Sequence, residues 1–135
     1  MSVKTFKKEF DSEKNSLLNQ ASSAVKNTGL YGWNLVTAGT PVLTGRARGS
    51  WLLTVDDIDN TTLPPTKGSK RVHPEPSRPK IKFDISKSNW MFITNNVDYI
   101  EYLEDGTDKF EPFAMVANAV PKINKELQRR FNNIK

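Results

Sequence analysis

The sequence predicts an α+β domain in which helices at both ends flank a three-stranded antiparallel sheet. Apolar residues recur with helical spacing near both ends of the chain, over 6–38 and 113–134. β-forming residues gather between them, over 51–58, 80–85 and 90–97. At 135 residues the chain has the length of one ordinary domain.

The first predicted element is a long amphipathic helix over residues 6–38. Its apolar side chains, at separations compatible with a 3.6-residue period, are Phe6, Phe10, Leu17, Ala21, Ala24, Tyr31 and Leu35. Because Gly29 and Gly32 each cost about 1 kcal/mol relative to alanine in a helix interior, we expect a bend or a short break there. Pro41 disfavours helical geometry at Thr40 and should end the helix.

A short helix over 44–50 is expected next, because the Thr44 side chain can accept a hydrogen bond from a backbone N–H group two or three residues later. Three strands should follow at 51–58, 80–85 and 90–97, with a hairpin turn at 87–89 joining the last two. Residues 61–80 have no periodicity and include five prolines. We therefore expect a long, flexible, basic loop at about 60–80.

Two helices are predicted in the last third of the chain. A short acidic helix over 99–104 should end at Gly106, since glycine can adopt the left-handed conformation that closes a helix. The final helix should begin at 111–113, with Pro112 in its first turn. Its apolar stripe is Phe113, Val116, Val120, Ile123, Leu127, Phe131 and Ile134. Pro121 lies within this stripe and removes one helical hydrogen bond, so we expect a kink or a restart there.

The composition excludes several classes of chemistry. The chain has no cysteine and a single histidine, His73, which lies in the proline-rich segment. We therefore expect no enzyme, no metal ligand and no cofactor site. No stretch approaches the roughly 20 apolar residues of a membrane span. The N-terminus also lacks the features of a signal peptide, so we expect a soluble, cytosolic protein with no membrane partner.

Charge is segregated along a chain whose formal net charge is +5. Segment 60–82 contains six Lys or Arg and one acid, segment 98–111 contains six acids and one lysine, and segment 122–135 is basic again. Opposite patches on one chain can steer its copies together. The expected contact residues between subunits or rings are Lys67, Lys70, Arg71, Arg78, Glu101, Asp105 and Asp108.

Three short motifs occur in order: TPVLTGRARGSW at 40–51, YIEYLEDGT at 99–107 and EPFAMVANA at 111–119. Behind a long N-terminal helix, this order resembles the small head-to-tail connector proteins of long-tailed bacteriophages, also called tail-completion or neck proteins. The matching residues are Thr40, Pro41, Val42, Thr44, Gly45, Arg48, Ser50, Tyr99, Tyr102, Glu104, Gly106, Thr107, Pro112, Phe113 and Ala117. The sequence departs from the family pattern at Leu43, Ala47 and Ile100.

The resemblance implies a virion structural protein that is made in the host cytoplasm and forms a ring in the phage neck, or collar. Such a ring, of six or twelve copies of the chain, joins the portal or connector of the DNA-filled head to the tail tube. Its partners would be adjacent head-connector and tail proteins, with genomic DNA passing through the lumen. The resemblance implies neither a reaction nor a cofactor.

The motif residues also have simpler structural interpretations. Gly45 suits a close approach of two chain segments, while Trp51, Trp90 and Phe113 suit a hydrophobic core. Arg48 and Glu104 are candidates for an ion pair, the alternative being two solvated charges.

A competing function is nonspecific DNA binding by the basic loop and the basic C-terminal helix. The cations involved would be Lys67, Lys70, Arg71, Arg78, Lys122, Lys125, Arg129 and Arg130. The absence of aromatic residues over 61–82 argues against stacking on single strands. A third interpretation is that the loop charges are simply solvated.

Overall fold

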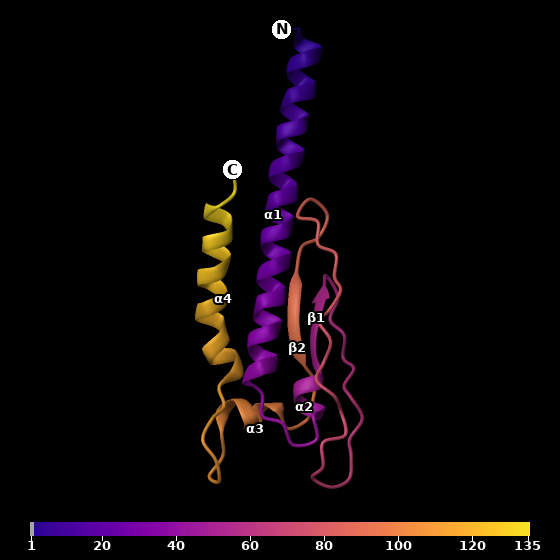
Figure 1. Ribbon diagram of the computed structural model, residues 1–135, viewed down its shortest axis with the longest axis vertical. Helices are drawn as coiled ribbons and strands as arrows, with labels where there is room; N and C mark the ends of the chain where they lie inside the picture. The colour runs from indigo at the N-terminus through magenta and orange to yellow at the C-terminus, as the bar shows by residue number, and fades with distance from the viewer. Residues whose placement is uncertain (1) are drawn as a thin grey trace.

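The computed structural model describes residues 2–135 and has an α+β fold, as predicted. Its elements are α1 (Val3–Gly39), α2 (Arg46–Gly49), β1 (Trp51–Val55), β2 (Met91–Asn95), α3 (Ile100–Asp105) and α4 (Met115–Asn132). The long helix α1 forms the axis of the molecule, with α4 along one side and the sheet along the other (Figure 1). Within residues 2–135, no helix has the combination of length and apolar character needed to cross a membrane.

The sheet has two antiparallel strands, so the prediction of three strands is wrong. Strands β1 and β2 pair directly, with Trp51 opposite Asn95. Residues 80–85 form no strand, and Ile81 packs against the core. The backbone N–H of Ile85 donates to Ser22 Oγ of α1 at 2.9 Å. Ile81 and Phe83 are partly buried and Ile85 is exposed, so the alternation of polar and apolar residues reflects the partial burial of two side chains without strand pairing.

A long connection, residues 56–90, joins the two strands. It begins at Asp56, whose φ of 66° ends β1 three residues earlier than expected. The Asp56 carboxylate accepts hydrogen bonds from the backbone N–H groups of Asn89 at 2.7 Å and Trp90 at 3.0 Å. This carboxylate therefore ties the two ends of the connection together.

Helix α1 continues without interruption through Gly29 and Gly32, so the expected break is absent. A Cβ atom on Gly29 would overlap the Met91 side chain of β2. A Cβ on Gly32 would lie 2.7 Å from Ile123 Cδ1 and 2.9 Å from Ile93 Cδ1. The glycines therefore permit close approach of the sheet and α4, and the packing they allow outweighs their helix propensity.

Helix α3 ends before Gly106, as predicted, and Gly106 has a φ of 79°. Helix α4 begins at Met115, so Pro112 precedes the helix and the prediction that it lies in the first turn is wrong. The backbone N–H of Phe113 instead donates to the Leu103 carbonyl at 2.9 Å, which folds the intervening turn back on α3. Helix α4 also continues through Pro121 without a restart.

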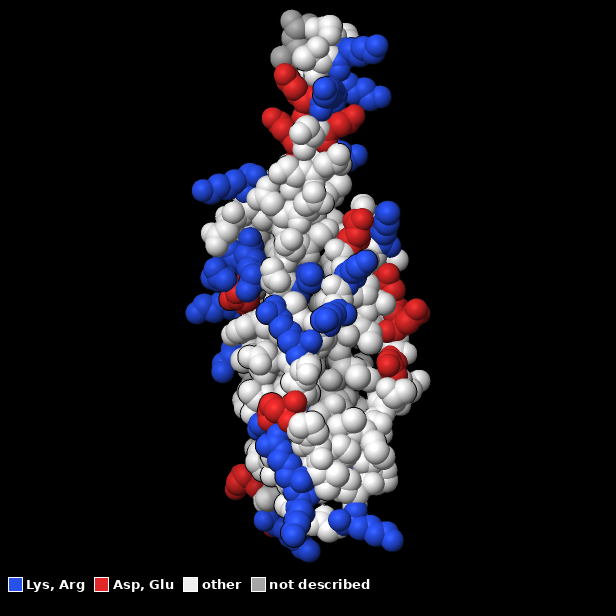
Figure 2. Space-filling view, turned by 45° about the vertical axis from the view of Figure 1, so that its right-hand side comes forward, with Lys and Arg blue, Asp and Glu red and all other residues white. Residues whose placement is uncertain are grey.

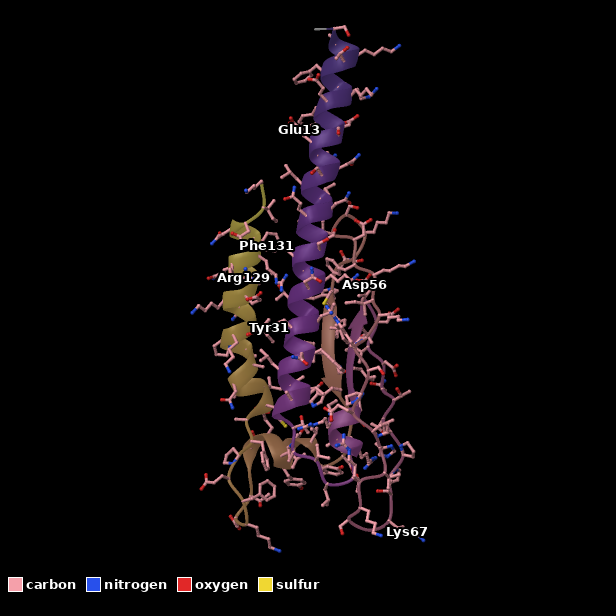
Figure 3. The ribbon with its side chains drawn as sticks, in the orientation of Figure 1. Glu13, Tyr31, Asp56, Lys67, Arg129 and Phe131 are labelled. Atoms are coloured by element: carbon pink, nitrogen blue, oxygen red, sulfur yellow. The ribbon has the colours of Figure 1, made fainter. Side chains whose placement is uncertain are left out.

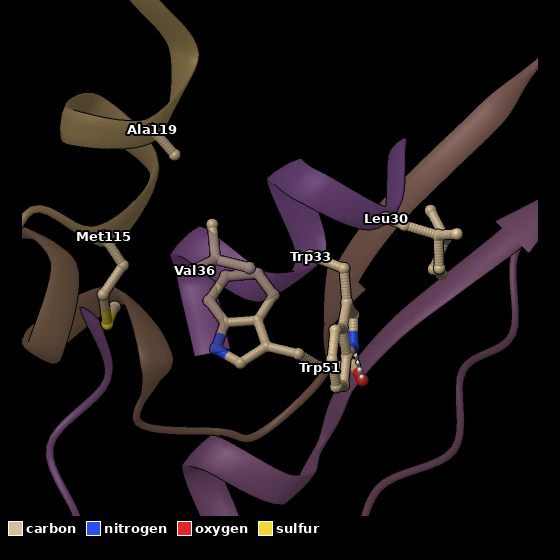
Figure 4. Close-up of a cluster of buried hydrophobic side chains, with 7 residues drawn as sticks. Leu30, Trp33, Val36, Trp51, Met115 and Ala119 are labelled. Carbon is tan, nitrogen blue, oxygen red and sulfur yellow. Dashed lines mark hydrogen bonds between the residues drawn. The ribbon is translucent and has the colours of Figure 1, made fainter. Parts of the chain in front are cut away.

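The core lies where the lower half of α1 meets the sheet and the start of α4 (Figure 4). Its buried members are Leu30, Trp33, Val36, Trp51, Leu53, Met115 and Ala119. The Trp33 indole donates to the Trp51 carbonyl at 3.0 Å, and Trp51 is in the core as predicted.

Other apolar residues that the sequence assigned to the core lie at the surface. Trp90 is 65% exposed and stacks on Phe92 at the start of β2. Phe113 is 40% exposed and packs on Phe110 in the turn before α4. The expected stripe of α4 is only partly covered, with Val116, Val120 and Phe131 exposed.

Candidate functional site

The three motifs meet at the end of the molecule opposite the N-terminus, which we call the base. The base comprises α2, α3, the turn at 106–114 and the tip of the connection around Lys67 (Figures 1 and 3). An apolar groove of about 360 Å³ lies between the first two motifs and is lined by residues that include Leu43, Tyr99 and Leu103. Leu43 is 65% exposed, so the base offers apolar as well as charged surface to a partner.

Thr44 and Gly45 of the first motif hold the connection against α2. The Thr44 Oγ1 atom accepts from the Arg46 N–H at 3.3 Å, as the sequence suggested. The Thr44 carbonyl accepts from the N–H groups of Val72 and His73, both at 2.9 Å. Gly45 has a φ of 88°, and a Cβ there would overlap the His73 carbonyl oxygen. Glycine is required at this position for both reasons.

Arg48 links the end of α1 to the connection. Its Nε and Nη2 atoms donate to the Thr40 carbonyl at 3.0 and 2.9 Å, and Nη2 also lies 3.4 Å from the Ala38 carbonyl. Its Nη1 atom pairs with Glu75 at 3.1 Å. Arg71 also pairs with Glu75, at 2.8 Å, and the two guanidinium groups, Arg71 first, hold the pKa of Glu75 below its ordinary value.

The predicted pair between Arg48 and Glu104 is wrong, because Glu104 binds the start of α4. Its two carboxylate oxygens accept from the backbone N–H groups of Val116 at 2.8 Å and Ala117 at 3.0 Å. A carboxylate at this position satisfies N–H groups that have no partner within the helix and interacts favourably with the helix dipole. Glu104 therefore joins the second motif to the third.

The two tyrosines of the second motif have different environments. The Tyr99 ring lies beneath the Arg46 guanidinium, whose Cζ atom is 5.7 Å from the ring centroid. Arg46 also pairs with Asp98 at 3.2 Å. Tyr102 is 62% exposed and lines a second apolar groove, with Leu103 and Phe110, of about 530 Å³.

The predicted contact residues divide between the two sides of the base. The turn that follows α3 lies on one side, and the tip of the connection around Lys67 lies on the other (Figures 1 and 3). Figure 2, which brings the side of the connection forward, shows Lys and Arg side chains running down this face as far as the base. Among residues 2–135, the ion pairs include none formed by Lys67, Lys70, Glu101, Asp105 or Asp108.

Two of the predicted contact residues do not belong to the tip. Arg71 is occupied by Glu75 within the same chain. Arg78 lines a hollow against α1 together with Asn27, Tyr31 and Arg130. Lys67 therefore marks the basic tip at the base, with Lys70 three residues later in the chain, whereas Arg71 and Arg78 have neighbours within their own chain.

The part of the chain that the structure describes contains no group of three or more His, Cys, Asp or Glu side chains arranged to hold a metal ion. The Nε2 atom of His73 lies 3.2 Å from the Pro64 carbonyl oxygen, within the connection. Comparison of the chain with protein-family models, with curated proteins and with solved structures finds no match in any of the three.

Proposed function

We propose that this chain is a virion structural protein of a long-tailed bacteriophage, and that its copies form a ring in the neck between head and tail. The ring would have six or twelve copies, with adjacent head-connector and tail proteins as partners and genomic DNA passing through its lumen. Two observations support the proposal: the order of the three motifs, and the division of charge at the base.

The division of charge is the observation on which the ring depends. Lys67, which Figure 3 labels, lies on one side of the base, with Lys70 three residues later in the chain, and the acidic turn that follows α3 lies on the other side (Figures 1 and 3). When copies stand side by side in the same direction, the basic tip of one faces the acidic turn of the next. A contact between two different surfaces repeats from copy to copy, and it closes into a ring when the rotation between copies is a whole fraction of a turn. A two-fold dimer through either surface would instead bring like charges together.

The experiment measures the mass of the purified protein by light scattering and images it by negative staining. Lys67→Glu with Lys70→Glu should lower the fraction of rings, and Asp105→Lys with Asp108→Lys in the same chain should restore it. Lys80→Glu with Lys82→Glu is the matched control, because it makes the same charge change in the same connection, close to where Ile85 meets α1.

Rising salt should also dissociate the rings, since the Debye length falls to about 3 Å at 1 M. Rings that are indifferent both to salt and to the charge reversal at Lys67 and Lys70 would contradict the proposed contact.

Several of the cations expected to bind DNA form ion pairs within the chain, which weakens the competing DNA-binding function. Arg129 and Arg130 both pair with Glu126, at 2.6 and 2.9 Å, and Arg71 pairs with Glu75. A protein that stays monomeric and binds duplex DNA with a steep salt dependence would favour DNA binding over the ring.

A further inference from the structure

The N-terminal part of α1 carries an uncovered apolar stripe. Residues 3–17, which we call the arm, extend beyond the rest of the molecule (Figure 1), and all of them are exposed. Val3, Phe6, Phe10 and Leu17 are 87%, 60%, 56% and 48% exposed. Their spacing of three, four and seven residues places them on one helix face. Large contiguous apolar surface on a helix indicates a contact with a partner.

The same face of α1 is covered further along the helix. Ala24 and Thr28, about two and three helical turns beyond the arm, are buried, and Gly32 packs against Ile123 of α4. The segment that covers this face of α1 ends at Lys135, whose backbone forms hydrogen bonds of 3.1 and 3.2 Å with the Gln20 side chain. An apolar groove of about 470 Å³ opens there, and its lining includes Phe10, Leu17 and Ile134. The stripe of the arm is therefore the continuation of an interface that α4 covers only in part.

The sequence of the arm has the heptad spacing of a coiled coil. Val3, Phe10 and Leu17 occupy the a positions, while Phe6 and Glu13 occupy the d positions. Glu13 is the one polar residue among them, and a polar core position lowers stability while it specifies register. The arm is thus suited to a weak contact with a defined alignment.

The flanking charges select the direction of the partner helix. Glu9 is at a g position, and Lys7 and Lys14 are at e positions. In a parallel pair, a g residue lies beside the e residue five positions later on the neighbour, so Glu9 meets Lys14. In an antiparallel pair e positions face each other, and Lys7 would meet Lys14. Opposite charges favour the parallel arrangement and like charges oppose the antiparallel one.

We propose that the arms of neighbouring copies pack two by two, as parallel helices, at the end of the ring opposite the base, because a parallel pair joins the same face of two helices and does not repeat from copy to copy as the base contact does. This inference rests on the proposed ring, in which the copies stand side by side with α1 pointing in one direction. A coil of about two heptads is marginal on its own. The contacts at the base hold the arms near one another, and the resulting high effective concentration drives their association.

The cysteine-free chain permits a direct test of alignment by disulfide formation in the full-length protein. Val3→Cys should give a covalent dimer on mild oxidation, because a parallel pair brings the two Val3 positions to a distance that a disulfide spans. In an antiparallel pair a positions pack against d positions, so Val3→Cys would not meet its own copy and Phe6→Cys would instead cross-link to Leu17→Cys of a second chain. Lys8→Cys is the matched control, since residue 8 lies on the opposite face of the arm and should remain uncross-linked.

Two further sets of variants test the contacts themselves. Phe6→Ser with Phe10→Ser, introduced into the Val3→Cys chain, should reduce the yield of covalent dimer several-fold. Both side chains are more than half exposed, so the fold should survive. Glu9→Lys or Lys14→Glu alone should lower the yield, and the two together should restore it.

The outcomes separate this inference from the ring. Rings without a Val3→Cys disulfide overturn the arm contact and leave the ring in place. Cross-linking only between Phe6→Cys and Leu17→Cys also overturns the parallel arm contact and leaves the ring in place. A Val3→Cys disulfide in a protein that otherwise never exceeds a dimer supports the arm contact and contradicts the ring. A monomer that forms no disulfide overturns the arm contact in solution.

Discussion

Replacing Arg48 with alanine should destabilise the protein, because the Arg48 guanidinium donates hydrogen bonds to backbone carbonyl groups at the C-terminal end of α1. The Arg48 side chain is 22% exposed, and its guanidinium donates to the Thr40 and Ala38 carbonyls over 2.9–3.4 Å. The last four carbonyls of a helix have no partner within it. Removing the guanidinium therefore leaves carbonyl groups at the helix end without their charged donor.

The magnitude follows from these contacts. A hydrogen bond from a charged donor contributes about 1.5–3 kcal/mol, and a cation at a helix C-terminus contributes about 0.3–1 kcal/mol. The two effects share one set of contacts and do not add fully. We expect Arg48→Ala to lower the free energy of unfolding by about 1.5–3 kcal/mol. For a domain of this size the Tm should fall on the order of 10 °C.

The assay is urea unfolding followed by tryptophan fluorescence, with Arg48→Lys as the control. Lysine keeps the charge and loses the planar fork that reaches several acceptors, so it should recover part of the stability. Double-mutant cycles should show a modest coupling of Arg48 to Glu75, whose side chain is 56% exposed. They should show no coupling to Glu104, which binds α4 instead.

A loss below about 1 kcal/mol for Arg48→Ala would refute this account, because it would match a solvated side chain. A clear coupling energy between Arg48 and Glu104 would refute it as well, and would restore the ion pair that the sequence suggested.

Three further predictions concern single residues. Gly45→Ala should destabilise the protein more than Gly68→Ala. Both glycines have nearly the same φ, 88° and 89°, yet only Gly45 has the His73 carbonyl oxygen where a Cβ atom would lie. The difference between the urea midpoints of the two variants therefore measures the effect of that contact. Equal losses of stability would contradict this role of the His73 carbonyl. Glu104→Ala should cost about 1–2 kcal/mol through loss of the cap on α4, measured by thermal unfolding, and a neutral result would show that the cap is unimportant. The backbone N–H groups of Trp90 and Asn89 lower the pKa of Asp56. The ionised carboxylate therefore stabilises the fold above the ordinary aspartate pKa, and this stability is lost as the pH falls through the lower pKa of the folded state. Asp56→Asn should flatten the decline of stability below about pH 4, and an unchanged decline would contradict the assignment.

The features that the sequence predicted correctly depend on neighbours along the chain. Helix α1 ends before Pro41, α2 begins after the hydrogen bond accepted by Thr44, and α3 ends before Gly106. Each boundary is set by backbone restrictions or hydrogen bonds that span a few residues, so it can be predicted from the sequence without a structure. Trp51 was assigned to the core because it is a large aromatic residue, and the same argument was wrong for Trp90 and Phe113.

The features that the sequence did not predict depend on groups far apart in the chain. Strand β1 pairs with β2 across residues 56–90, and residues 80–85 contact α1 and the core instead of extending the sheet. Gly29 and Gly32 stay helical because side chains of β2 and α4 fill the space beside them. Apolar periodicity predicts which face of an element is suited to burial, and it does not specify which neighbour covers that face or whether one does.

The same limit applies to the base. Segregated charge and the order of the motifs were visible in the sequence, but the partners of the charges were not. The sequence suggested an ion pair between Arg48 and Glu104, and the fold gives each of them a different partner. The connection brings Glu75 to Arg48, and the turn after α3 brings Glu104 to α4. Only the tertiary structure shows that the basic tip and the acidic turn lie on opposite sides of the base, because the path of the chain between them decides where each segment lies.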